Sequence, residues 1–115
     1  MNIDVKKVKI VVTVPSENAE EIIIALGNEG AGVIGEYSYC SISTNCIGTF
    51  KGSDNTNPYI GEKNKLEKVK EEKIELTCDI DIVKPVLVKL REVHPYEEPS
   101  IDIFPLLSED DFGRI

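Results

Sequence analysis

Alternating hydrophobic positions predict the strands of this chain. In its first part, Val8, Ile10, Val12 and Val14 fall on one face of an extended segment, and a similar alternation returns from residue 69 to residue 78. Between the two lies a segment rich in Tyr, Ser, Ile and Cys, for which we expect a strand with a bulge. The predicted strands cover residues 7–14, 35–47 and 69–78, and a fourth begins at Ile101.

Two other segments repeat their apolar residues at helical spacing. Residues 17–29 follow Ser16, a favourable N-cap, and precede Gly30, which suits the left-handed C′ position of a helix. The second helix takes Asp79 or Asp81 as its cap and holds Pro85 in its first turn, because a deeper proline costs about 3 kcal/mol. The apolar stripes are Ala19, Ile22, Ile23 and Leu26, then Val83, Val86, Leu87, Leu90 and Val93.

The resulting element order is βαββαβ, the split arrangement of ferredoxin-like α+β domains. We expect one antiparallel four-stranded sheet with two helices on one face, formed by a single domain over residues 1–115. The strands also carry apolar residues on their second face, including Val11 and Phe104. A sheet with an uncovered face and open edges predicts assembly with further copies of the chain.

Composition narrows the class of partner. The formal net charge is −8 and the isoelectric point about 4.6, which argues against duplex nucleic acid because affinity for it comes mainly from Lys and Arg. The longest apolar run covers only residues 22–26, and no signal-like segment is visible at the start. We therefore expect a cytoplasmic protein with no membrane partner.

The three cysteines, Cys40, Cys46 and Cys78, form no C-x-x-C pair. In a cytoplasmic protein we expect them to be reduced; a disulfide between Cys40 and Cys46, six residues apart, is the less favoured alternative. The longest segment without periodicity covers residues 53–65, and a long loop in a small domain is usually functional or mobile.

The segment His94-Pro95-Tyr96-Glu97-Glu98-Pro99 concentrates the candidate chemistry. Its two prolines prevent either neighbouring element from extending through it, so it forms a stiff corner. His94, Glu97 and Glu98 offer imidazole and carboxylate ligands for a divalent metal. In the alternative interpretation, His94 hydrogen-bonds the end of the second helix while the glutamates accept from backbone amides or a neighbouring subunit.

Other catalytic patterns are weak or absent. The two glutamates are adjacent and diverge in direction, so they do not form an acid–base pair on one substrate. The sequence lacks a Ser/His/Asp order, a P-loop and an H-x-x-x-H pattern. The glycines from Gly30 to Gly35 follow a helix instead of opening one, so they fail as a phosphate cradle.

Several separated motifs together resemble one known family. They are Gly30-Ala31-Gly32, Gly35-Glu36-Tyr37, Cys40, Gly48-Thr49-Phe50, Pro58, Ile60-Gly61, Glu71, Glu75 and the His94–Pro99 corner. In this order they resemble the YqfO-like module, which is inserted in many Nif-three-like proteins and also occurs alone. The resemblance covers residues 8–107 and implies a fold akin to the CutA proteins and the PII signalling proteins.

The resemblance also carries implications for assembly and activity. The CutA and PII relatives are trimers joined through their sheets, and in PII proteins the loop comparable to residues 50–66 here contacts protein partners. Nif-three-like proteins are often labelled dinuclear-metal hydrolases, but the metal ligands belong to two flanking domains that have no counterpart in this sequence. The hydrolase label therefore finds no residues here on which to rest.

These observations predict a non-catalytic regulatory module that senses a ligand or a divalent metal and assembles as a homotrimer. We expect a cleft at the subunit boundary between the corner, the turn at residues 30–37 and the loop at residues 50–61. The ligand or interface residues expected there are Gly35, Tyr37, Cys40, Phe50, Gly61 and Tyr96, with His94, Glu97 and Glu98 for a cation. A metal-dependent hydrolase using the latter three is the alternative, and a structural partner of a larger complex is another.

Overall fold

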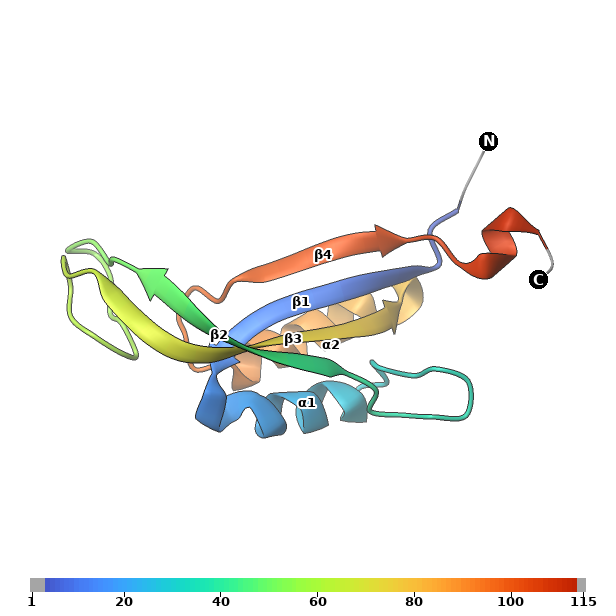
Figure 1. The fold of residues 1–115 in the computed structure, drawn as a ribbon, viewed down its shortest axis with the longest axis horizontal. Helices are drawn as coiled ribbons and strands as arrows, with labels where there is room; N and C mark the ends of the chain where they lie inside the picture. Colours follow the sequence, from blue (N-terminus) through green and yellow to red (C-terminus); the bar gives the residue numbers. More distant parts are fainter. Residues whose placement is uncertain (1–3, 114–115) are drawn as a thin grey trace.

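The computed structural model describes residues 4–113 and confirms the predicted ferredoxin-like α+β fold (Figure 1). Four strands form one antiparallel sheet in the order β2-β3-β1-β4. Three short 3-10 turns, η1 to η3, complete the structure. In chain order the elements are β1 (Lys7–Pro15), η1 (Ser16–Asn18), α1 (Ala19–Asn28), β2 (Ile42–Phe50), β3 (Glu67–Asp79), η2 (Ile80–Ile82), α2 (Val83–Val93), β4 (Ile101–Leu106) and η3 (Glu109–Phe112).

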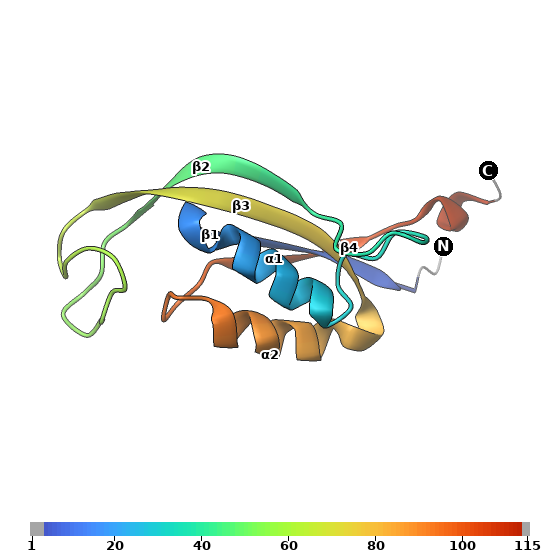
Figure 2. The same cartoon turned by 90° about the horizontal axis from the view of Figure 1, so that it is seen from below.

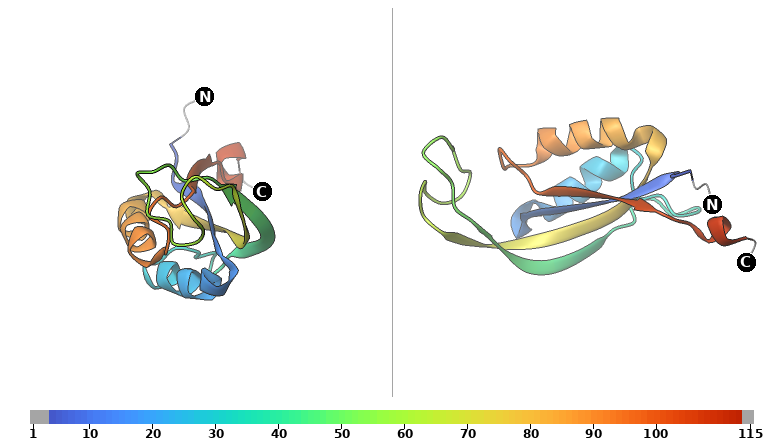
Figure 3. Two further views of the ribbon diagram at one scale, coloured as in Figure 1. Left: turned by 90° about the vertical axis from the view of Figure 1, so that its left-hand side faces the viewer. Right: turned by 90° about the horizontal axis from the view of Figure 1, so that it is seen from above.

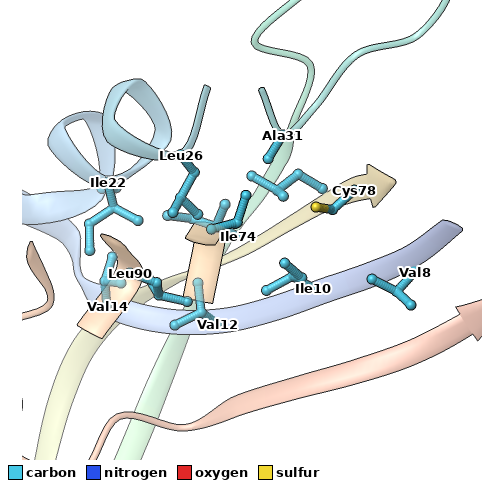
Figure 4. Close-up of a cluster of buried hydrophobic side chains, with 13 residues drawn as sticks. Val8, Ile10, Val12, Val14, Ile22, Leu26, Ala31, Ile74, Cys78 and Leu90 are labelled. Atoms are coloured by element: carbon cyan, nitrogen blue, oxygen red, sulfur yellow. The ribbon is translucent and has the colours of Figure 1, made fainter. Parts of the chain in front are cut away.

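Both helices lie side by side on the same face of the sheet, as Figure 2 and the right-hand view of Figure 3 show. The core fills the space between the helices and the sheet, and its central side chains are drawn in Figure 4. Each large aliphatic side chain buried there contributes roughly 1.5–3 kcal/mol relative to exposure. The fully buried residues are Ile10, Ile22, Leu26, Ile74, Leu90, Val12, Val14 and Val86.

The other face of the sheet has no covering layer in the described part of the chain. Val11 is partly buried there and Phe104 is 49% exposed. Strands β2 and β4 form the two edges of the sheet, so each has one side without a paired neighbour. The face and edges match the surface from which the sequence predicted self-association.

The β2–β3 hairpin extends beyond the rest of the sheet. Pro15, the last residue of β1, pairs with Glu71, whereas β2 continues to pair with β3 as far as Phe50 opposite Glu67. The end of this hairpin and the loop of residues 51–66 therefore lie beyond the end of β1, on the side of the molecule where the corner after α2 turns (Figure 2).

The second strand starts later than the sequence predicted. Residues 35–41 do not extend β2; instead Ile34 and Tyr37 pair in a small separate turn, and Cys40 donates its backbone N–H to the carbonyl of Gly32. Positive φ values at Gly32, Gly35 and Tyr39 prevent an extended strand through this segment. We call residues 33–41 the arm; it projects at the end of the molecule opposite the loop (Figure 1).

The helix starts also differ from prediction. Ser16 lies inside η1, and α1 begins after Asn18 with no side-chain cap. Neither Asp79 nor Asp81 caps α2, because η2 intervenes and Ile82 is the N-cap. The other helix boundaries hold. Pro85 lies in the first turn, and α1 ends in a Schellman motif in which Gly30 and Ala31 donate to the carbonyls of Gly27 and Leu26.

Candidate functional site

The corner begins where α2 ends. His94 is extended, with φ of −71° and ψ of 131°, because the ring of Pro95 disfavours a helical conformation in the residue before it. The backbone N–H of His94 still closes the last turn of the helix by donating to the carbonyl of Leu90 at 2.9 Å. The chain then turns through Tyr96 and Glu97 toward β4.

The His94 side chain is buried and its ring is fully used. Its Nε2 lies 2.8 Å from the carbonyl oxygen of Thr13, and its Nδ1 accepts the backbone N–H of Tyr96 at 3.1 Å. The two bonds require the neutral tautomer with the proton on Nε2. Burial lowers the pKa of His94, and the Thr13 carbonyl and Glu71 oppose part of that shift. His94 therefore fastens the corner to β1.

Tyr96 connects the corner to a buried carboxylate on β3. Its hydroxyl donates to Oε2 of Glu71 at 2.8 Å, and only 5% of Glu71 is exposed. The room for this carboxylate comes from Gly48 on β2, because a Cβ at that position would overlap Oε1 of Glu71. Burial and the neighbouring Glu71 raise the pKa of the Tyr96 hydroxyl, which therefore stays protonated and donates.

The long loop rests on the same corner. Asn57 in the loop donates its backbone N–H to Oε1 of Glu97 at 2.8 Å. The rings of Phe50 and Tyr59 each lie 6.3 Å from the ring of Tyr96, centre to centre. This spacing is within the range of favourable aromatic pairs. The loop and hairpin end thus meet the corner through this hydrogen bond and two aromatic contacts, in addition to the hydrogen bond from Tyr96 to Glu71.

A pocket of about 250 Å³ lies between them. We call it the hairpin–corner pocket. It is lined by Thr13, Gly48, Thr49, Phe50, Lys51, Gly52, Thr56, Pro58, Tyr59, Ile60, Glu71, Tyr96, Glu97, Glu98 and Ser100. Its wall combines aromatic rings with carboxylates, a composition suited to holding a small ligand by both apolar and polar contacts.

The structure brings together only part of the predicted site. Phe50, Tyr96, Glu97 and Glu98 line the pocket, with His94 beneath Tyr96. Gly61 lies in the same loop, but it does not line the pocket. Gly35, Tyr37 and Cys40 lie in the arm, at the opposite end of the molecule (Figure 1). Within one chain the predicted three-part cleft is therefore reduced to the corner and the loop.

The three residues expected to bind a metal do not form a ligand cluster in one chain. Among residues 4–113, no group of three His, Cys, Asp or Glu side chains is placed to hold a metal ion. Both ring nitrogens of His94 already have backbone partners, but these are Thr13 and Tyr96 and not the end of the second helix that the alternative interpretation expected. Glu97 accepts a backbone amide, as that interpretation also expected.

Sequence reasoning gave no site role to Glu71, Gly48 or Tyr59. Glu71 and Gly48 were noticed only as parts of a family resemblance. One signal could have singled them out: a glycine inside a strand often marks close approach by another group. The pairing register places Gly48 diagonally across from Glu71, since Cys46 pairs with Glu71 and Gly48 pairs with Val69.

The cysteines are free, as predicted: Cys40 and Cys46 are partly exposed and Cys78 is buried. Burial, with a smaller effect from the neighbouring Asp79 carboxylate, raises the pKa of Cys78 to about 11. No helix within the described residues is long and apolar enough to cross a membrane.

The sheet, its two helices and the proline corner define a ferredoxin-like module of the CutA type. The divalent ion tolerance protein CutA1 of Ehrlichia chaffeensis superposes with a TM-score of 0.66 at 22% identity, covering 93% of this chain and 88% of that one. A Bacillus cereus protein related to NIF3 superposes with a TM-score of 0.77 at 36% identity, covering 93% of this chain and 27% of that one.

Sequence comparison leads to the same group. The GTP cyclohydrolase 1 type 2 homologs of Halalkalibacterium halodurans and Bacillus subtilis are each 43% identical over 110 residues, 93% of this chain. No family model matches. The chain belongs with the YqfO-like modules of Nif-three-like proteins, as its motifs predicted, and it spans about 30% of the length of these relatives.

Proposed function

We propose that this chain is a non-catalytic regulatory module that binds a small ligand in the hairpin–corner pocket. The observation that carries the proposal is that the pocket is closed by two segments distant in sequence. Asn57 in the loop and Glu97 in the corner join across it through an exposed hydrogen bond of 2.8 Å. A ligand bound between these segments would reposition the loop, so occupancy of the pocket could be read at the surface.

The loop is the element through which the module would report. Most of residues 51–66 are exposed, and Tyr59 and Leu66 are 53% and 64% exposed. Exposed apolar side chains on a loop anchored at one pocket support a contact with a protein partner. In PII proteins, whose fold the sequence resembles, the comparable loop contacts protein partners, and this supports the same role for the loop here.

The uncovered sheet face supports assembly of this cytoplasmic module as a homotrimer. A second copy would also be the source of the arm residues Gly35, Tyr37 and Cys40, which one chain holds far from its own pocket. Size-exclusion chromatography with light scattering at micromolar concentration tests the assembly. A monomer under these conditions would contradict it.

A metal-sensing role needs ligands beyond those that one chain brings together. A metal-dependent hydrolase built on His94 would require the ring to break its two hydrogen bonds with backbone groups. Glu97 and Glu98 remain the candidates for a cation in a shared site. Metal analysis of the purified protein measures this directly. A stoichiometric metal that His94→Ala removes would favour the hydrolase over the binding module.

The binding proposal is tested by following backbone amides by NMR while a fragment library is added. The library contains neutral, anionic and cationic members together with divalent metal salts. We expect at least one class to shift the amides of Gly48, Asn57 and Tyr96 together while leaving the helices unchanged. If no class shifts these three amides, the pocket is not a binding site and the proposal fails.

A further inference from the structure

We infer that the hairpin–corner pocket takes a small organic cation, a protonated amine joined to a compact apolar body. The inference rests on the proposed function and names the chemical class of its ligand. It is carried by a buried carboxylate that has no cationic partner among the described residues, set in a pocket walled by aromatic rings.

The carboxylate is that of Glu71. It is 95% buried, yet it takes part in none of the ion pairs between described residues. Its Oε2 accepts the hydroxyl of Tyr96, and none of the side-chain hydrogen bonds found among residues 4–113 ends on Oε1, which is left for a ligand in the pocket that Glu71 lines. Buried charged side chains are ordinarily paired, because an uncompensated charge is costly away from water. A cation in the pocket would supply the missing partner.

The rings beside Glu71 fit the same ligand. Tyr96 donates to the carboxylate, and Phe50 and Tyr59 flank Tyr96 at equal centre-to-centre distances of 6.3 Å. Aromatic faces attract alkylammonium groups through the ring quadrupole, by about 0.5–2 kcal/mol depending on solvation. A hydrated metal ion, in contrast, would be bound by the carboxylates and would gain nothing from the aromatic rings. The walls therefore favour a cation that carries carbon.

The net charge of the pocket lining is negative. Glu71, Glu97 and Glu98 line it against Lys51, the one lining lysine or arginine, which leaves a formal excess of two negative charges. Clefts lined by one sign of charge raise the local concentration of oppositely charged ligands. An anionic ligand would have to approach against this excess.

The size of the pocket limits the body of the ligand. Its 250 Å³ lies below the 300–1,000 Å³ typical of pockets for drug-sized molecules. A protonated amine on a single ring or a short aliphatic chain fits this volume.

The test uses three probes of one shape: benzylammonium, benzyl alcohol and benzoate. Each is titrated at pH 7.5 into the full chain while the amides of Gly48, Asn57 and Tyr96 are followed by NMR. We expect benzylammonium to bind at least tenfold more tightly than the other two. Glu71→Gln keeps the shape of the side chain without its charge and should weaken benzylammonium at least tenfold, whereas Glu20→Gln on the exposed face of α1 should change nothing.

Near-UV circular dichroism tests whether Glu71→Gln is folded. If the variant is not folded, the inference is tested by the three probes on the unchanged protein and by the variant Glu98→Gln. In Glu98→Gln we expect the affinity for benzylammonium to fall at least twofold. Equal or tighter binding of benzyl alcohol or benzoate at these amides would overturn the inference while leaving the binding module intact. Tighter saturation of the same amides by magnesium or zinc chloride would also overturn it.

Discussion

Gly48 on β2 lies directly against the carboxylate of Glu71 on β3, so closely that a Cβ on Gly48 would occupy the position of Oε1. The contact explains how a strand can carry a buried acidic side chain beside another strand. The carboxylate of Glu71 fills the space that a side chain at Gly48 would take, and Tyr96 holds this carboxylate in place with a hydrogen bond of 2.8 Å.

Gly48→Ala should therefore displace the Glu71 side chain. We expect a loss of about 1–3 kcal/mol in the free energy of unfolding, the usual range for an added group in a packed site. Urea unfolding measures it. Thr49→Ala, the next position on the same strand, is exposed and should change the free energy much less. Equal losses in the two variants would mean that the close approach to Glu71 has no energetic weight.

Tyr96→Phe removes the only described donor to Glu71. The ring still packs against Phe50 and Tyr59, so the main effect is a buried carboxylate left without its hydrogen bond. We expect a destabilisation of about 1–3 kcal/mol in thermal or urea unfolding. The control is Ser16→Ala in η1, which also removes a hydroxyl but at an exposed position away from the pocket, and the free energy should stay unchanged.

Acid should destabilise the fold through His94. Burial lowers the pKa of this residue below its unfolded value, so the unfolded chain binds a proton first as the pH falls. The stability that neutral His94 supports is thus present above pH 6.5 and is lost progressively below it, down to the pKa of the folded state. Protonation would also set an N–H at Nδ1 against the N–H of Tyr96.

The measurement compares urea unfolding of the natural chain and of His94→Gln at pH 7.5 and pH 5.5. Both proteins share every other titrating group, so the difference between their pH dependences isolates His94. We expect the natural chain to lose more stability on acidification than the variant. An identical loss in both would show that His94 keeps the same proton affinity on folding.

The cysteines should separate into two reactive thiols and one inert thiol. Cys40 and Cys46 are partly exposed, whereas Cys78 is 2% exposed and its pKa is raised to about 11. At pH 8 we expect iodoacetamide to modify the first two and to reach Cys78 only after unfolding, because the thiolate is the reactive form. Peptide mass spectrometry locates the labels. Labelling of all three at one rate in the folded protein would contradict the buried position of Cys78.

The amino-acid pattern was sufficient for the order and the type of the elements. The alternation of Val8, Ile10, Val12 and Val14 permits one inward face only, and a helix cannot continue through the bond between His94 and Pro95. The start of β2 was predicted too early, because Tyr39, like two glycines near it, takes a positive φ that the residue type alone did not reveal.

The chemistry of the pocket depended on the tertiary structure. His94 stood out in the sequence as a metal ligand, yet its ring meets the carbonyl of Thr13, 81 positions away. Glu71 was noticed in the sequence only as part of a family resemblance, but the register of β2 on β3 and the hydrogen bond from Tyr96 place it in the buried wall of the pocket. Local pattern determines which way a residue faces on its own element; which other element lies opposite is set only when the sheet has formed.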